Sequence, residues 1–306
     1  MKTLKKRLDE YIKMKRLMGF KMQRSEYELK RFIDFIAKKN KKTITLELVL
    51  SWIKRSKTSR NITKRKHLVM IRKFLCFLNQ EDTKIPIPNL NLIPIEANQK
   101  YKPYVYTDKE IKEILKATRI LTNFCQHTYE TLFGLLAVTG MRIGEAIRLN
   151  QEDFNEKDGV LLIRDSKFGK FRELVLHKTT VKALQRYLLF KKKYFKIIPT
   201  NAFFISMSRK RLIYENINFI FIKILGPAGL KTTKPNRPRL HDLRHTFAIR
   251  SIIDCYKSKG NCEKRLYELS TYMGHSSPAN TYWYLTAVPE LLAEGVKKLE
   301  KTKEQV

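Results

Sequence analysis

The most informative stretch of this chain is His241-Asp242-Leu243-Arg244-His245-Thr246-Phe247-Ala248-Ile249-Arg250. On a helix, His241 and Arg244 lie three positions apart and therefore share one face. A histidine can transfer a proton near neutral pH, and the planar guanidinium of an arginine can bond two oxygens of one phosphate. The pair is suited to gripping and activating a phosphodiester, so the stretch points to chemistry on nucleic acid.

The charge of the whole chain fits such a substrate. The 306 residues include 63 Lys and Arg against 29 Asp and Glu, a formal net charge of +34. Residues 1–100 hold 26 Lys and Arg against 9 Asp and Glu, so +17, half of the total, lies on the first third. This charge would bind phosphates by releasing counterions, and we expect the N-terminal third to be a DNA-binding unit. Solvated helix faces in a lysine-rich proteome are the simpler alternative for part of it.

Composition limits the other classes of protein. With 43% hydrophobic residues the chain is expected to fold, and its charged start and lack of long apolar runs predict a cytoplasmic protein without a signal peptide or membrane span. The four cysteines form no Cys-x-x-Cys pair and no zinc-ligand pattern with histidine, so we expect reduced, mostly structural thiols and no metal. They are Cys76, Cys125, Cys255 and Cys262.

The N-terminal third predicts a small all-helical bundle, because its apolar residues recur at helical spacing. They are Leu4, Leu8, Tyr11 and Ile12, then Leu29, Phe32, Ile33 and Ile36, then Leu68, Ile71, Leu75 and Leu78. Two basic runs, 55–60 and 64–66, are expected to lie along a DNA backbone.

A change in composition marks the domain boundary. Four prolines from Pro86 to Pro103 predict an extended linker, which gives a helical domain at 1–98 and a second domain at 99–306. The second domain opens with a capping box, Thr107 to Glu110. It is expected to be mostly helical with a small antiparallel β-sheet, whose strands are predicted at 159–164 and 171–176, with a third short strand at 202–205.

Four separated motifs follow one known order. They are Thr139-Gly140-Met141-Arg142-Ile143-Gly144-Glu145, the hairpin Ser166-Lys167-Phe168-Gly169-Lys170-Phe171-Arg172, the pair His241 and Arg244, and Gly274-His275-Ser276-Ser277 with Tyr284 nine residues after His275. From about Thr107 to Glu290 the chain resembles the tyrosine recombinases, the phage-integrase family. The helical N-terminal region resembles the SAM-like core-binding domain of that family, and each motif alone is weak whereas the ordered set is specific.

The resemblance implies that Tyr284 is the nucleophile, which would form a 3′-phosphotyrosyl bond to DNA. Tyr282 is the nearest competitor, but two phenols two positions apart on a helix point in different directions, so only one can face the phosphate. The spacing from His275 favours Tyr284. Ser277 and Pro278 supply an N-cap and a first-turn proline for a short helix that carries the tyrosine.

The same resemblance gives roles to the basic residues. Arg142 and Arg244 would clamp the scissile phosphate, because a guanidinium fork can bond two oxygens of the transition state. Glu145 occupies the position where the family keeps an acidic residue that supports the site. Lys167, at the hairpin tip, would be the general acid for the leaving 5′ oxygen, and Lys170 in the same loop is its rival.

Three histidines are assigned different roles. His241 is expected to be the proton-transfer partner of Tyr284, and His275 to donate a hydrogen bond to a phosphate oxygen. His245 is expected to be a structural support beside Arg244. No metal or other cofactor is expected, because the arginines, the lysine and the histidines supply the electrophilic help that a metal would give.

The resemblance implies a site-specific recombinase or integrase that acts on double-stranded DNA with specific recombination sites. It would form a homotetramer in the synaptic complex, pass through a Holliday junction, and be a monomer or weak oligomer when free. Residues 281–285 with 289–291 are similar to those of mobile-element integrases and transposases, which favours integration, excision or transposition. Residues 289–296 predict a terminal helix that docks on its own or a neighbouring subunit.

Two alternative functions remain open at this point. A telomere resolvase or a type IB topoisomerase-like enzyme would use a similar tyrosine and basic residues. A catalytically silent DNA-binding protein on the same fold is the third possibility, and the filled positions Arg142, Arg244 and Tyr284 speak against it.

Overall fold

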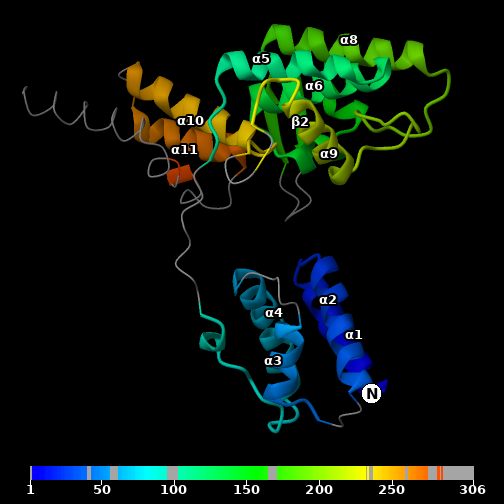
Figure 1. Cartoon of the computed structure of the whole chain (residues 1–306), viewed down its shortest axis with the longest axis vertical. Helices are drawn as coiled ribbons and strands as arrows, with labels where there is room; N and C mark the ends of the chain where they lie inside the picture. The colour runs from blue at the N-terminus through cyan, green and yellow to red at the C-terminus, as the bar shows by residue number, and fades with distance from the viewer. Residues whose placement is uncertain are drawn as a thin grey trace, which may run out of the picture. The chain divides into compact units, whose positions relative to one another are not determined.

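The computed structural model describes residues 2–39, 43–55, 61–94, 103–164, 171–231, 233, 237–258, 261–274, 281, 282 and 284. The chain divides into two compact units, Met1–Gln99 and Lys100–Val306. Helices dominate both units, and a small antiparallel sheet lies in the second (Figure 1). The predicted fold class, mainly α with a small antiparallel sheet, is confirmed. No helix within the described ranges is long and apolar enough to cross a membrane.

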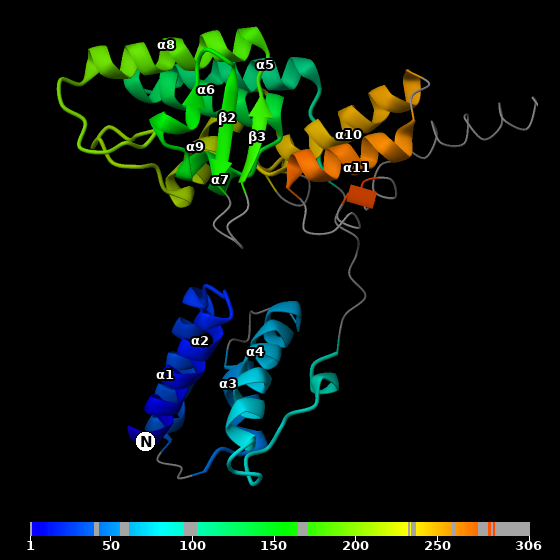
Figure 2. The ribbon, with the colours of Figure 1, turned by 180° about the vertical axis from the view of Figure 1, so that it is seen from behind.

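Amphipathic helices make up the described part of the N-terminal unit. Figure 2 shows α1 lying beside α2, and α3 beside α4. The apolar residues at helical spacing are the ones that become buried, and the rings of Phe32 and Trp52 meet edge to face with centroids 5.5 Å apart. The core is therefore built on interlocking large side chains. Its elements are α1 (Lys2–Leu17), α2 (Gln23–Lys38), α3 (Leu46–Lys54), α4 (Asn61–Asn79) and the short 3₁₀ helix η1 (Leu90–Leu92).

The first part of the proline-containing segment after α4 is not an extended linker. It packs on α4, where Arg65 Nη1 donates 2.7 Å hydrogen bonds to the carbonyls of Leu90 and Ile93. Ile93 is 4% exposed and belongs to the N-terminal core. Prolines leave neighbouring carbonyls without helical partners, so an arginine from the adjacent helix satisfies them. Arg65, which we expected along a DNA backbone, is thus bonded within the protein.

The described part of the second unit opens with the predicted capping box. The hydroxyl of Thr107 accepts a hydrogen bond from the backbone of Glu110, and the Glu110 carboxylate accepts one from the backbone of Thr107, which confirms the capping box. The elements that follow are α5 (Asp108–Ala117), η2 (Thr118–Ile120), α6 (Asn123–Thr139), α7 (Ile143–Arg148), η3 (Gln151–Asp153), β1 (Phe154–Asn155), β2 (Val160–Arg164), β3 (Phe171–Val175), α8 (Lys178–Tyr194), α9 (Tyr214–Leu225), α10 (Asp242–Lys257) and α11 (Cys262–Met273).

The sheet has the order β1-β2-β3, with both pairings antiparallel. The two longer strands agree with the prediction, and Leu161 pairs with Leu174 so that both enter the core. The prediction of a third strand at 202–205 is wrong, because the third strand is β1. In the described chain residues 202 and 205 make only isolated bridges. The carbonyls of residues 202 and 203 accept hydrogen bonds from the buried Lys191 instead of from a strand.

The last two described helices form a pair at one end of the unit. In both views α10 and α11 lie side by side (Figures 1 and 2). They share a small apolar core that includes Ile249, Leu266 and Met273, and Tyr284 belongs to the same cluster. Because α10 also packs on α6, this pair places the ends of α6, α10 and α11 close together.

Candidate active site

Arg142 is held at the junction of α6 and α7. After α6, Gly140 takes the left-handed conformation with φ of 59°. A β-carbon on Gly140 would lie 2.4 Å from Cδ1 of Phe247 on α10, so glycine permits both the turn and the close helix contact. Arg142 then caps the start of α7, and its side chain is 37% exposed. The guanidinium is therefore fixed at its base and open to a ligand.

Glu145 is the buried counter-ion of this arginine. Its side chain is 2% exposed, and its carboxylate accepts hydrogen bonds from Arg142 Nη1 at 2.9 Å and from the Arg142 backbone at 2.7 Å. Burial by itself would raise the pKa of Glu145, but the hydrogen bonds and charge of Arg172 and the hydrogen bonds of Arg142 outweigh it and lower that pKa. Glu145 is thus an ionised carboxylate that orients Arg142, as expected of a supporting residue.

Arg172 is a site residue that the sequence reasoning missed, since it entered there only as the last residue of the hairpin motif. From β3, its Nη1 and Nη2 donate to the two carboxylate oxygens of Glu145 at 3.1 and 2.7 Å, and its Nε donates to the carbonyl of Tyr272 at 2.9 Å. A usable signal existed, because Arg172 shares a strand face with the buried Leu174. A cation on a buried face needs hydrogen-bond acceptors or an acidic partner, and here the acidic partner is Glu145.

Arg244 is almost fully buried, at 3% exposure. Its Nη1 donates to the carbonyl of Gly140 at 2.7 Å and its Nη2 to the carbonyl of Met273 at 2.8 Å. Burial, followed by the charge of Arg142, lowers the pKa of Arg244 to about 10, so it stays protonated at neutral pH. A guanidinium carries five N–H donors, and two bonds to main-chain carbonyls leave others for an anion.

The end of α11 supplies carbonyls to all three arginines. In addition to the bonds of Tyr272 with Arg172 and of Met273 with Arg244, the carbonyl of Gly274 accepts a 2.7 Å hydrogen bond from Arg142 Nη2. Consecutive carbonyls point this way because the last turn of a helix leaves its carbonyls without helical partners. The end of α11 therefore orients the cations.

Tyr284 places a buried phenol beside this cluster. The residue is 2% exposed, and its hydroxyl lies 3.0 Å from Nδ1 of His245. Burial raises the pKa of Tyr284, whereas the positive charges of Arg244 and Arg142 act in the opposite direction. The phenol is therefore protonated at neutral pH, and its proton needs an acceptor before the oxygen can react.

The histidine that contacts Tyr284 is not the expected one. His241 was expected to be the proton-transfer partner, but the structure gives that contact to His245, which we expected to be structural. His241 precedes the first turn of α10, and His245 lies one turn further along the same face, with ring centroids 4.8 Å apart. Burial, followed by the charge of Arg244, lowers the pKa of His241, so its imidazole is neutral at neutral pH.

The two candidate tyrosines differ sharply in burial. Tyr282 is 50% exposed, whereas Tyr284 is enclosed with its hydroxyl on His245. This difference agrees with the expectation that two phenols two positions apart on a helix point in different directions. The sequence-based choice of Tyr284 therefore has geometric support.

Several predicted residues lie outside the described part of the chain. They are Lys167 and its rival Lys170, His275, Ser277, Pro278 and the predicted terminal helix at 289–296. Among the described residues, Arg142, Glu145, Arg244, His245 and Tyr284 come together, Arg172 joins them, and the ring of His241 meets that of His245 edge to face.

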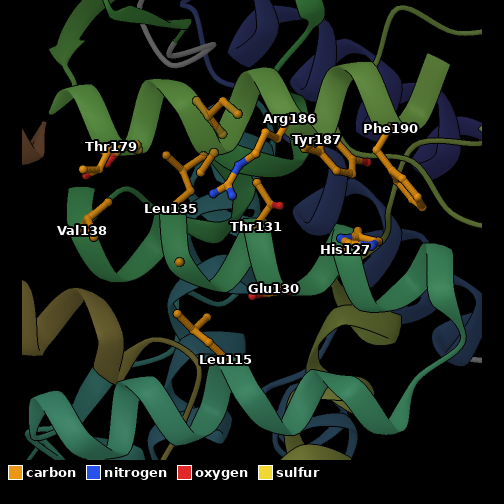
Figure 3. Close-up of a pocket in the computed structure, with 14 residues that line it drawn as sticks. Leu115, His127, Glu130, Thr131, Leu135, Val138, Thr179, Arg186, Tyr187 and Phe190 are labelled. Atoms are coloured by element: carbon orange, nitrogen blue, oxygen red, sulfur yellow. The ribbon is translucent and has the colours of Figure 1, made fainter. Parts of the chain in front are cut away.

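Neither a metal cluster nor the cavity in Figure 3 accounts for this site. Within the described ranges, no three His, Cys, Asp or Glu side chains gather as ligands for an ion. The cavity, of about 540 Å³, lies between α6 and α8 and is lined by Leu135, Thr179 and Tyr187 among others, with no residue of the arginine cluster. Arg142 is instead the member of the arginine cluster that is most exposed to solvent.

Comparison with known proteins gives a consistent picture. The model of the phage integrase family matches residues 105–290. A protein of Sinorhizobium fredii that is named as an integrase/recombinase, y4rB, is 34% identical over an alignment 311 positions long, which covers 98% of each chain.

Solved structures share the fold at lower identity. The Tn1549 transposon integrase, in complex with transposon right end DNA, matches with a TM-score of 0.68 and 16% identity over 96% of this chain and 98% of that one. A lambda integrase tetramer bound to a Holliday junction matches with a TM-score of 0.60 and 18% identity over 90% of this chain and 78% of that one.

Proposed function

This chain belongs to the phage integrase family, and we propose that it cleaves and rejoins DNA strands through a covalent bond to Tyr284. One observation carries the proposal. The buried phenol of Tyr284 contacts a histidine while its pKa responds to the charges of two arginines that come from distant parts of the chain. Such a cluster combines a nucleophile, a proton acceptor and charge stabilisation.

The first step is attack of the Tyr284 oxygen on the phosphorus of the scissile phosphodiester. The new bond joins that oxygen to phosphorus, and the bond from phosphorus to the 5′ oxygen breaks. The phenol proton passes to the histidine that it already contacts, so His245 is the residue of choice for this role. A free 5′ hydroxyl of another strand can reverse the reaction, because the phosphotyrosine conserves the energy of the bond.

Arg142 and Arg244 stabilise the charge that gathers on the non-bridging oxygens. Both are oriented before substrate arrives, Arg142 by Glu145 and a carbonyl, and Arg244 by two carbonyls. Preorganised donors of this kind need little rearrangement in the transition state. Arg172 completes the arrangement, because its two Nη atoms donate hydrogen bonds to the two carboxylate oxygens of Glu145.

The leaving 5′ oxygen needs a proton, and we assign this to Lys167 on the basis of the family resemblance. His275 is assigned, on the same basis, a hydrogen bond to a phosphate oxygen. The reaction requires no metal in this scheme, because the arginines provide the positive charge at the phosphate.

A role in moving a mobile element fits the relatives. The similar S. fredii protein is named an integrase/recombinase, and the Tn1549 structure contains transposon end DNA. By analogy with the lambda integrase tetramer on a Holliday junction, we propose that this chain also assembles as a homotetramer on paired recombination sites. The basic N-terminal unit would add affinity for the flanking duplex.

Covalent trapping tests the proposal directly. A duplex carrying a candidate element end, nicked just beyond the scissile phosphate, loses its short leaving strand on cleavage and accumulates the protein–DNA adduct. We expect the adduct with the unaltered chain and with Tyr282→Phe, and none with Tyr284→Phe, in buffer containing EDTA. An adduct formed by Tyr284→Phe, or one that appears only with magnesium, would overturn the mechanism.

The general acid has its own test. When sulfur replaces the bridging 5′ oxygen, the leaving thiolate is stable without a proton. Lys167→Ala should therefore cleave the ordinary substrate slowly and the sulfur substrate at close to the normal rate. Lys170→Ala is the matched control, and rescue of Lys170→Ala alone would move the assignment to that residue.

A further inference from the structure

Two thiols face each other where α10 is followed by α11. Cys255 lies in the last turn of α10, and Cys262 is the first residue of α11. Their Sγ atoms are 3.3 Å apart, in contact but not joined by a disulfide bond. Cys255 is 8% exposed, whereas Cys262 is partly open to solvent. Cys262 is therefore the more exposed residue of the pair.

The separation is close to that of a disulfide. A disulfide bond is about 2.05 Å long, so the two sulfur atoms need to approach each other by only about 1.3 Å to form one. The sequence spacing of Cys255 and Cys262 could not reveal this, because it does not show how two successive helices are packed. We propose that these two thiols form a reversible disulfide, which makes the α10–α11 junction a site of redox modification independent of the strand-transfer chemistry.

The oxidant that we assign is a low-molecular-weight disulfide such as glutathione disulfide. The thiolate of Cys262 attacks one of its sulfur atoms, so a mixed disulfide forms and one glutathione thiolate leaves. The thiolate of Cys255 then attacks the sulfur of Cys262 and releases the second glutathione. Two protein thiols are oxidised, one glutathione disulfide is reduced, and the two protons reside on the two glutathione products.

The disulfide would stabilise the helix pair that orients the arginines. Cys262 starts the helix whose far end presents the carbonyls of Tyr272, Met273 and Gly274 to the guanidinium groups. A cross-link at the start of α11 limits local unfolding of this helix away from α10. Closing so short a loop should raise the midpoint of thermal unfolding of the C-terminal unit by roughly 5 °C.

Mass spectrometry of the full chain tests the proposal. After incubation with glutathione disulfide under native conditions, alkylation should block two cysteines instead of four, and peptide mapping should show Cys255 linked to Cys262. Dithiothreitol should restore all four thiols. The double variant Cys76→Ser with Cys125→Ser should behave identically, since both of its remaining cysteines belong to the proposed site.

The order of attack gives a second readout. Cys255→Ser should stop at a stable glutathione adduct on Cys262, whereas Cys262→Ser should react much more slowly, because the remaining thiol is buried. Four alkylated cysteines at every ratio of oxidised to reduced glutathione would overturn the proposal, as would a disulfide that involves Cys76 or Cys125. Neither result depends on DNA cleavage, so the failure of this proposal is distinguishable from failure of the proposed function.

Discussion

Two buried cations of the C-terminal unit, Arg244 and Lys191, are held in the same way but in different surroundings. Arg244 is 3% exposed and donates to two main-chain carbonyls, and Lys191 is 1% exposed and does the same through Nζ at 3.1 and 2.8 Å. Burial lowers the pKa of Arg244 to about 10 and that of Lys191 to about 8. Burial and satisfied hydrogen bonds therefore do not by themselves distinguish a functional cation.

The neighbours make the difference. The pKa of Arg244 responds to Glu145, Arg142 and Tyr284, so an acid, a second cation and a nucleophile are all within electrostatic reach. Lys191 lies instead over the rings of Tyr187 and Phe203. An ammonium has three donors and a guanidinium has five, so Arg244 keeps more capacity for a ligand. We infer that Lys191 is a brace for the segment at 202–203, and that Arg244 is part of the chemistry.

Truncation of the two cations should give the largest contrast. Loss of one preorganised donor to the developing charge costs on the order of 10³ in rate, so Arg244→Ala should lower single-turnover cleavage by about that factor. Lys191→Met keeps the length and apolar character of the side chain and should cleave within a few-fold of the unaltered chain. DNA binding and circular dichroism would verify folding. An equal loss of cleavage rate in both variants would show that the two cations do not differ in function.

The counter-ion should have the next largest effect. Glu145→Gln keeps the shape of the side chain but removes the charge that aligns Arg142 and Arg172. Misplacement of a catalytic group by about 1 Å costs on the order of 10² in rate, and we expect a loss of that size with DNA affinity little changed. Glu152→Gln, in an exposed ion pair with Arg164, is the control. A normal rate for Glu145→Gln would show that Arg142 needs no such support.

Gly140, in the turn before Arg142, should affect stability more than Gly134 within α6. Gly140→Ala places a β-carbon 2.4 Å from Phe247 in a left-handed backbone conformation. The combined cost should be about 2 kcal/mol in the free energy of unfolding, measured by urea denaturation. Gly134→Ala, whose β-carbon would meet nothing nearer than 3.9 Å, should be neutral or slightly stabilising. If both variants were neutral, the close packing of α6 on α10 would not position Arg142.

The last contrast is the gradual pH dependence that Lys191 should contribute to stability. Because the folded protein holds this lysine at a pKa of about 8, below its ordinary value of 10.5, the unfolded chain binds more protons between these pH values. The free energy of unfolding should therefore rise with pH across this window, by at most about 1.4 kcal/mol per unit for one proton. The difference in stability between the unaltered chain and Lys191→Met should show this slope. A difference that is flat from pH 8 to 10 would contradict the assigned pKa.

The sequence predicts much of the fold because its signals are local. The capping box at Thr107 needs only residues within one turn, and the strands at 160–164 and 171–175 need only alternation and a short loop. The prediction of the third strand was wrong for a non-local reason. The run at 202–205 has the composition of a strand, but Lys191, contributed by α8, takes its carbonyls.

The site shows the same limit. The order of the motifs points to Arg142, Arg244 and Tyr284, because each of these residues lies in its own recognisable motif. Which of two histidines one turn apart reaches Tyr284 depends on how α10 packs, and sequence reasoning chose His241 where the structure has His245. Arg172 acts through the acid of another element, so its role becomes visible only when β3 and α7 are placed together.

The most direct test identifies the residue that becomes attached to DNA. The trapped adduct can be digested with trypsin and nuclease, and the peptide that retains a nucleotide can be sequenced by mass spectrometry. We predict that the nucleotide is on Tyr284 and that its yield falls strongly in His245→Ala but less in His241→Ala. A nucleotide on Tyr282, or full yield without His245, would contradict the central role of the buried phenol and its histidine.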